Sequence, residues 1–139
     1  MRKIHVKFPE FQVNLVIEMD ERNKALCDEV WEALPFDGVQ EHSMVSGQSM
    51  YAWVPMISTA KVPVKMLRTE APIGWCAFNQ GTGNKISMKY GDLSEDLYGN
   101  SLGFIPQEYH GVLKMIGREI WANYFGDKKI YRVCFSKGA

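Results

Sequence analysis

Hydrophobic and polar residues alternate in several short segments of the chain, and this pattern predicts β-strands. The alternation runs over residues 3–7 and again over residues 11–19, with Pro9 and Glu10 between them. Two alternating segments joined by so short a turn favour an antiparallel hairpin. The same pattern predicts further strands at residues 38–45, 50–54 and 130–135.

A second hairpin is predicted in the middle of the chain. Residues 73–78 are mostly apolar, residues 85–89 alternate, and Gly81-Thr82-Gly83 lies between the two segments. Glycine adopts the backbone conformations that tight hairpin turns require. We expect the second strand of this hairpin to stop at Tyr90-Gly91-Asp92.

Prolines and glycines predict irregular structure on both sides of this hairpin. Pro55, Pro63 and Pro72 interrupt the segment before it, which favours a loop with a short edge strand near residues 62–65. Residues 91–106 are polar and glycine-containing, so they predict a long loop. Loops of this length in a compact domain are often functional.

Two segments have the spacing of amphipathic helices. Asp20 is the predicted N-cap of the first, and Pro35 and Gly38 end it. Its apolar stripe consists of Cys27, Val30, Trp31 and Leu34. The second helix is predicted over residues 107–125, although Gly111 and Gly117 weaken it by ~1 kcal/mol each relative to alanine.

The order of these elements predicts the fold class. Two strands, a helix, several strands, a helix and a strand make a mostly β protein, and most strands are joined by short turns. A closed antiparallel β-barrel with two helices fits this order better than a parallel sheet. With 139 residues, the chain is expected to form a single domain over residues 1–139.

Charge and cysteine usage narrow the function classes. The 16 Lys and Arg residues balance 16 Asp and Glu residues, so we expect no nucleic-acid partner. No apolar run reaches the roughly 18 residues that a membrane helix needs, and no signal peptide is evident. Cys27, Cys76 and Cys134 are far apart and odd in number, which predicts reduced thiols and a cytoplasmic location.

The sequence predicts no metal site and no cofactor. His5, His42 and His110 lie far apart and lack the spacing of metal ligands. The Gly81-Thr82-Gly83 turn lacks the third glycine and the following helix that dinucleotide binding requires.

The chain resembles the cyclophilin-like barrel in its order of elements. A strand that ends Val16-Ile17-Glu18-Met19-Asp20 leads to a helix that ends near Trp31-Glu32-Ala33-Leu34-Pro35, and Val39-Gln40-Glu41-His42-Ser43 follows as a strand. More closely, the chain is similar to a prokaryotic family of unknown function with this fold. The similar motifs are Trp31-Glu32-Ala33-Leu34-Pro35-Phe36, Pro72-Ile73-Gly74 and Lys89-Tyr90-Gly91-Asp92, within residues 11–135.

One departure from the cyclophilin pattern bears on activity. Prolyl isomerases of this fold carry an arginine directly after the strand histidine, whereas Ser43 follows His42 here. Their Phe-Met-x-Gln-Gly-Gly-Asp run has no equivalent in residues 48–53. Because a cationic donor stabilises the twisted amide, we expect that the protein is not a prolyl isomerase.

Polar and aromatic residues near predicted strand ends indicate a pocket at the barrel mouth. Histidine titrates near neutral pH, which suits His42 to proton transfer. Aromatic side chains with polar groups suit small-ligand sites. The alternative for each of these residues is ordinary packing in the protein core. The predicted lining is His42, Gln48, Tyr51, Trp53, Tyr90 and Asp92.

Two functions remain open. The first is the binding of a small molecule in this pocket, or an enzyme with His42 as acid/base and Asp92 as its orienter or second carboxylate. We predict that His42 and Asp92 approach one pocket. The alternative is a non-catalytic module that forms a homo-oligomer or binds a peptide or protein, to which eight methionines would give adaptable contacts.

Overall fold

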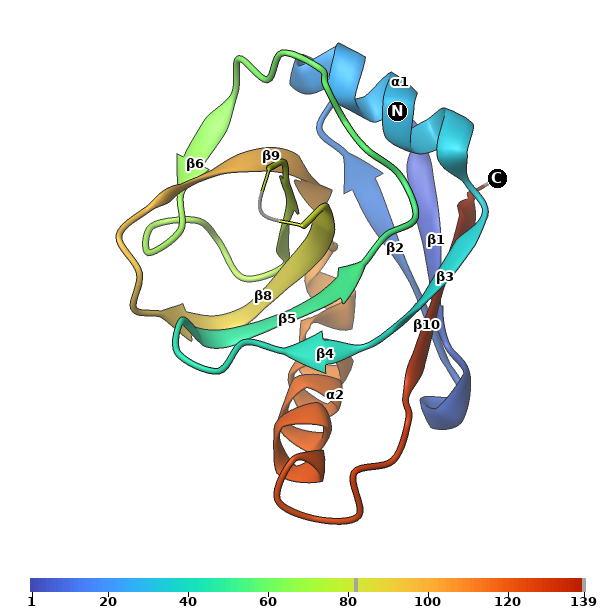
Figure 1. Cartoon of the computed structure of the whole chain (residues 1–139), viewed down its shortest axis with the longest axis vertical. Coiled ribbons are helices and arrows are strands. Elements are labelled where there is room, and N and C mark those ends of the chain that lie inside the picture. Colours follow the sequence, from blue (N-terminus) through green and yellow to red (C-terminus); the bar gives the residue numbers. More distant parts are fainter. Residues whose placement is uncertain (82, 139) are drawn as a thin grey trace.

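The computed structural model describes residues 1–81 and 83–138. In this part of the chain, nine antiparallel strands form a nearly closed barrel in the order β3-β10-β1-β2-β9-β7-β8-β5-β4, and a tenth strand, β6, pairs with β9 (Figure 1). The strands are β1 Lys3–Phe8, β2 Val13–Met19, β3 Phe36–Val39, β4 Glu41–His42, β5 Gly47–Trp53, β6 Lys65–Leu67, β7 Trp75–Asn79, β8 Lys85–Leu93, β9 Tyr98–Phe104 and β10 Arg132–Lys137. The predicted mostly β barrel with two helices is confirmed.

The two ends of this strand order lie next to each other in the chain. Only Gln40 separates β3 from β4, and Gly38 of β3 lies against the Trp53 carbonyl of β5. The split of the predicted 38–45 strand at Gln40 therefore lets one segment serve both edges of the sheet. This arrangement brings the sheet to near closure.

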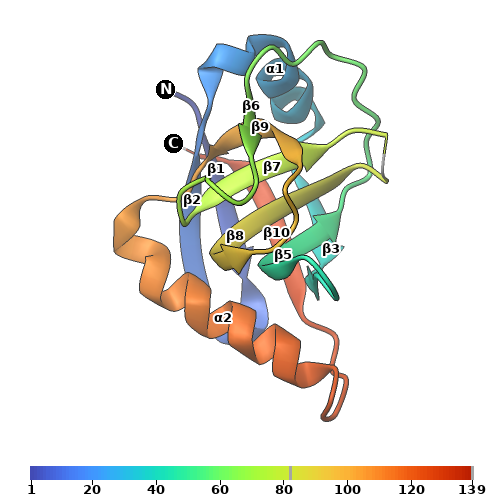
Figure 2. The ribbon, with the colours of Figure 1, turned by 90° about the vertical axis from the view of Figure 1, so that its left-hand side faces the viewer.

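The two helices lie on different parts of the barrel. Helix α1, Lys24–Ala33, lies over one end, and α2, His110–Asn123, packs against β8, β4 and β5. Figure 2 shows α2 alongside the barrel, below β8 and β5 in that view. Its buried residues are Leu113, Ile116, Gly117 and Ile120, which recur at helical spacing. The predicted helix at residues 107–125 is thus confirmed, with a short 3-10 turn, Gln107–Tyr109, at its start.

The prediction of a long loop at residues 91–106 is wrong. Strand β8 continues to Leu93, and β9 lies between β2 and β7 in the barrel. The glycines that indicated a loop instead make room for neighbouring groups. A Cβ at Gly99 would lie 2.8 Å from the Trp75 ring, and one at Gly103 would overlap the carbonyl of Glu18.

Smaller differences concern element ends. The short edge strand expected near residues 62–65 is β6, which begins three residues later and ends two residues later than predicted. Asp20 accepts a hydrogen bond from the Arg22 backbone N–H, as an N-cap does, but a 3-10 turn, Glu21–Asn23, precedes α1. The predicted Gly81-Thr82-Gly83 turn includes Thr82, which lies outside the described residues.

Within residues 1–81 and 83–138, none of the helices has both the length and the apolar character to cross a membrane.

Candidate functional site

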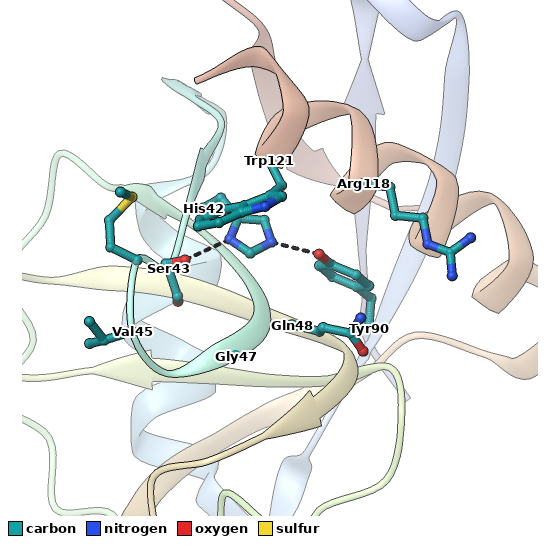
Figure 3. A pocket seen from close by; sticks show the side chains of 9 residues that line it. His42, Ser43, Val45, Gly47, Gln48, Tyr90, Arg118 and Trp121 are labelled. Carbon is teal, nitrogen blue, oxygen red and sulfur yellow. Dashed lines mark hydrogen bonds between the residues drawn. The ribbon is translucent and has the colours of Figure 1, made fainter. Parts of the chain in front are cut away.

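A buried histidine on β4 forms the centre of the candidate site. The His42 side chain is 3% exposed and its strand partner on β5 is Met50. Its Nδ1 lies 2.7 Å from the Ser43 carbonyl oxygen and its Nε2 lies 2.6 Å from the Tyr90 hydroxyl. Figure 3 shows the imidazole held between these two groups. Both ring nitrogens therefore have a partner.

Helix α2 covers this histidine from the other side. The Trp121 ring packs on the imidazole, with ring centroids 4.9 Å apart. The backbone N–H of His42 donates to the hydroxyl of Tyr124, at 2.6 Å. Trp121 and Tyr124 thus join the C-terminal part of α2 to β4.

Burial sets the charge state of His42. Removal from water lowers the pKa of the imidazole, and the hydrogen bond to the Ser43 carbonyl opposes this effect. The neutral ring is therefore favoured in the folded protein.

We expect this lowered pKa to make stability depend on pH. The unfolded chain binds a proton at higher pH than the folded protein, so this contribution to stability is fully present above about pH 6.5 and is lost as the pH falls below that value. Denaturant unfolding between about pH 7.5 and about pH 5.5 measures the slope. A His42→Gln variant should lose part of the slope, whereas His5→Gln, which replaces the half-buried histidine of β1, should keep it. An unchanged slope in His42→Gln would contradict this prediction.

Tyr90 reaches the histidine because β8 bulges where it passes β5. Gly47 pairs with Leu93 and Ser49 with Lys89, so β8 has two more residues than β5 in this interval. The buried Tyr90 ring then lies directly against Gly117 of α2, where a Cβ would overlap it. Gly117 therefore permits the close approach of strand and helix.

A pocket of about 360 Å³ opens beside this contact. His42 and Tyr90 line it from the barrel, and Arg118 and Trp121 line it from α2. Figure 3 shows Trp121 over the His42 ring and the Arg118 guanidinium on the far side of Tyr90 from His42. The β4–β5 turn supplies the exposed apolar residues Met44 and Val45, which are 64% and 83% exposed. The full lining is His42, Ser43, Met44, Val45, Gly47, Gln48, Tyr90, Arg118 and Trp121.

Arg118 is the charged group of this pocket. It forms no ion pair with any residue in the described part of the chain. Its positive charge is close enough to lower the pKa of Tyr90, although burial has the larger effect and raises that pKa. The phenol therefore stays protonated near neutral pH.

Asp92 lies in a neighbouring hollow of about 450 Å³, on the other side of Tyr90. Gln48 and Tyr90 line both hollows, and the Gln48 Oε1 accepts the Asp92 backbone N–H at 3.1 Å. The Asp92 side chain is exposed, in contrast to the buried His42. The two residues therefore lie in adjacent hollows, with Gln48 and Tyr90 between them.

The other two candidates lie elsewhere on the barrel. Tyr51 pairs with Glu41, so it faces away from His42. Tyr51 and Trp53 pack edge to face, with centroids 5.9 Å apart, and Lys85 lies over both rings. The structure thus brings together His42, Gln48 and Tyr90, places Asp92 beside them, and separates Tyr51 and Trp53.

Sequence reasoning missed the residues that α2 contributes, Arg118 and Trp121. Only one signal could have found them, the interior glycine Gly117, because it marks the helical face that another element approaches closely. No group of three or more His, Cys, Asp or Glu side chains in residues 1–81 and 83–138 could hold a metal ion.

Comparison with known proteins supports the fold. The sequence matches no protein-family model, and no curated protein matches it. Among solved structures, McbB in complex with tryptophan has a similar fold, with a TM-score of 0.88 and 23% sequence identity. The similarity covers 98% of this chain but 45% of the McbB chain. The chain thus spans less than half the length of that neighbour, and at this identity the similarity establishes the fold alone.

Proposed function

We propose that the protein binds a small anionic molecule with an apolar body in the pocket beside α2. The observation that carries this proposal is Arg118, an exposed residue of α2 that lines the pocket and forms no ion pair among the described residues. A guanidinium binds carboxylate and phosphate groups in a bidentate manner.

The rest of the pocket suits an apolar ligand body. Trp121, Met44 and Val45 offer aromatic and aliphatic surface in the pocket that Arg118 also lines. The volume of about 360 Å³ lies within the range of small-molecule sites. McbB has been solved with tryptophan. Tryptophan, which joins a carboxylate to an aromatic body, is therefore the first compound to test.

We expect an Arg118→Gln variant to bind such a ligand roughly tenfold more weakly, because it loses a charge-assisted hydrogen bond. Titration calorimetry with tryptophan and with indole-3-propionate measures this effect. Lys114→Gln is the matched control, since it removes the same charge one helical turn away, from the neighbouring hollow. Equal weakening in both variants would indicate a general effect of charge, and no binding by the unaltered protein would refute the proposal.

We further propose that the barrel is cyclophilin-like and bacterial, and that it is not a prolyl isomerase. Support comes from the motifs around Trp31 and Tyr90 and from Ser43 in place of the arginine. A rate above background with proline-containing peptides would refute the last point. The free thiols Cys27, Cys76 and Cys134 support a reducing, cytoplasmic location.

A second candidate function is a peptide-binding or oligomerisation module. The exposed side chains of Met44, Val45 and Phe125 near the pocket favour it, because exposed apolar groups that gather in one place often mark interfaces. Sedimentation of the purified protein separates the two candidates. A monomer at all concentrations would count against self-association.

A further inference from the structure

The hydrogen bonds of His42 fix the direction of the Tyr90 hydroxyl. The Ser43 carbonyl oxygen can only accept, so Nδ1 of His42 carries the proton of that 2.7 Å bond. In a neutral imidazole the other nitrogen, Nε2, is then an acceptor. The Tyr90 O–H must therefore donate to Nε2 across the 2.6 Å contact.

The neutral state of the ring follows from its surroundings. His42 is buried between Tyr90 and Trp121. Desolvation disfavours an imidazolium and outweighs the hydrogen bond to the Ser43 carbonyl, which favours it, so the pKa of His42 is lowered. The chain of donors and acceptors thus runs from the tyrosine, through the imidazole, to the backbone carbonyl.

This direction leaves the tyrosine oxygen with lone pairs and no proton to offer. Within the described residues, the Tyr90 hydroxyl has His42 as its hydrogen-bond partner, and Tyr90, which is 4% exposed, is among the residues that line both hollows. A ligand in either hollow that reaches this oxygen meets an acceptor. A ligand carbonyl or ether at the same place would face an oxygen without a donor, which costs free energy.

We propose that Tyr90 selects ligands that carry an N–H or O–H donor in addition to the anionic group that Arg118 binds. This inference rests on the proposed function of the pocket. It narrows the ligand class to donor-bearing anions, such as amino acids or acids with an N–H heterocycle.

Four related acids test the selection. Tryptophan carries an ammonium and an indole N–H, indole-3-propionate lacks the ammonium, 3-(benzothiophen-3-yl)alanine lacks the ring N–H, and 3-(benzothiophen-3-yl)propionate lacks both. All four keep the carboxylate and nearly the same ring shape. Their affinities for the unaltered protein, the Tyr90→Phe variant and the Tyr124→Phe control are measured by titration calorimetry.

We expect at least one donor to improve affinity roughly threefold to tenfold, the range of a single hydrogen bond. That gain should disappear in Tyr90→Phe and persist in Tyr124→Phe, which removes the hydroxyl on the other side of His42. Equal affinities for all four acids would overturn the inference and leave the proposed function intact. A gain that persists in Tyr90→Phe would also overturn it, and the absence of any binding would refute both.

A second measurement needs no variant. Nitrogen-15 NMR of the imidazole distinguishes a protonated from an unprotonated ring nitrogen. At neutral pH, we expect His42 to carry its proton on Nδ1 alone. A proton on Nε2 would reverse the Tyr90 hydroxyl and overturn the inference, even if the variants failed to fold.

Discussion

A Gly117→Ala variant is expected to be less stable than the unaltered protein by about 1–3 kcal/mol, the usual cost of overpacking. Helix propensity alone predicts the opposite, a gain of up to ~1 kcal/mol. Packing decides the sign, because a Cβ at this position overlaps the Tyr90 ring. Tyr90 is buried and bonded to His42, so the helix must move or the Tyr90–His42 hydrogen bond must break.

Gly111 provides the control for this prediction. It lies in the first turn of the same helix, and no atom lies within 4 Å of the place where its Cβ would be. We expect Gly111→Ala to be neutral or to stabilise the protein by up to ~1 kcal/mol. Denaturant unfolding of both variants measures the difference. If both substitutions stabilise equally, the close contact between Gly117 and Tyr90 is absent in solution.

Local patterns were sufficient to predict most of the barrel. The first hairpin has its apolar residues at every second position, and in β1 and β2 these residues, such as Ile4, Val6 and Ile17, are fully buried. Residues 98–104 gave no such signal. The two glycines of β9, Gly99 and Gly103, lie where the Trp75 ring and the β2 backbone approach closely. The local sequence does not reveal this constraint.

The site could be predicted only in part, for two physical reasons. Period-2 alternation tells which residues of one strand share a face, but the pairing register decides which strands face the same hollow. Because His42 pairs with Met50 and Glu41 with Tyr51, Tyr51 lies on the opposite face from His42. The second reason is the docking of α2. Gly117 indicates which face of the helix is approached closely, but the sequence around Arg118 does not indicate which part of the barrel this face covers.

Because His42 is buried and Asp92 is exposed, we expect substitutions at the two positions to differ in their effect on the free energy of unfolding. In a His42→Ala variant the Tyr90 hydroxyl and the Ser43 carbonyl lose their partner, and a cavity forms beneath Trp121. We expect a loss of roughly 2–4 kcal/mol in the free energy of unfolding. Asp92 interacts with Gln48 through its backbone N–H, which Asp92→Asn leaves in place. That change should stay within about 0.5 kcal/mol of the unaltered protein.

Denaturant unfolding measures the free energy of unfolding of His42→Ala and Asp92→Asn. Ligand binding to the same variants then shows whether each residue has a structural or a functional role. His42→Gln, which retains hydrogen-bonding groups, should recover part of the stability lost in His42→Ala because fewer buried groups are left without a partner. If Asp92→Asn is stable but binds the ligand more weakly, the ligand extends past Tyr90 into the neighbouring hollow, as a shared site of His42 and Asp92 requires. If Asp92→Asn binds as the unaltered protein does, the ligand stays in the Arg118 pocket. A stable His42→Ala variant with full binding would contradict the central place that the buried imidazole has in this site.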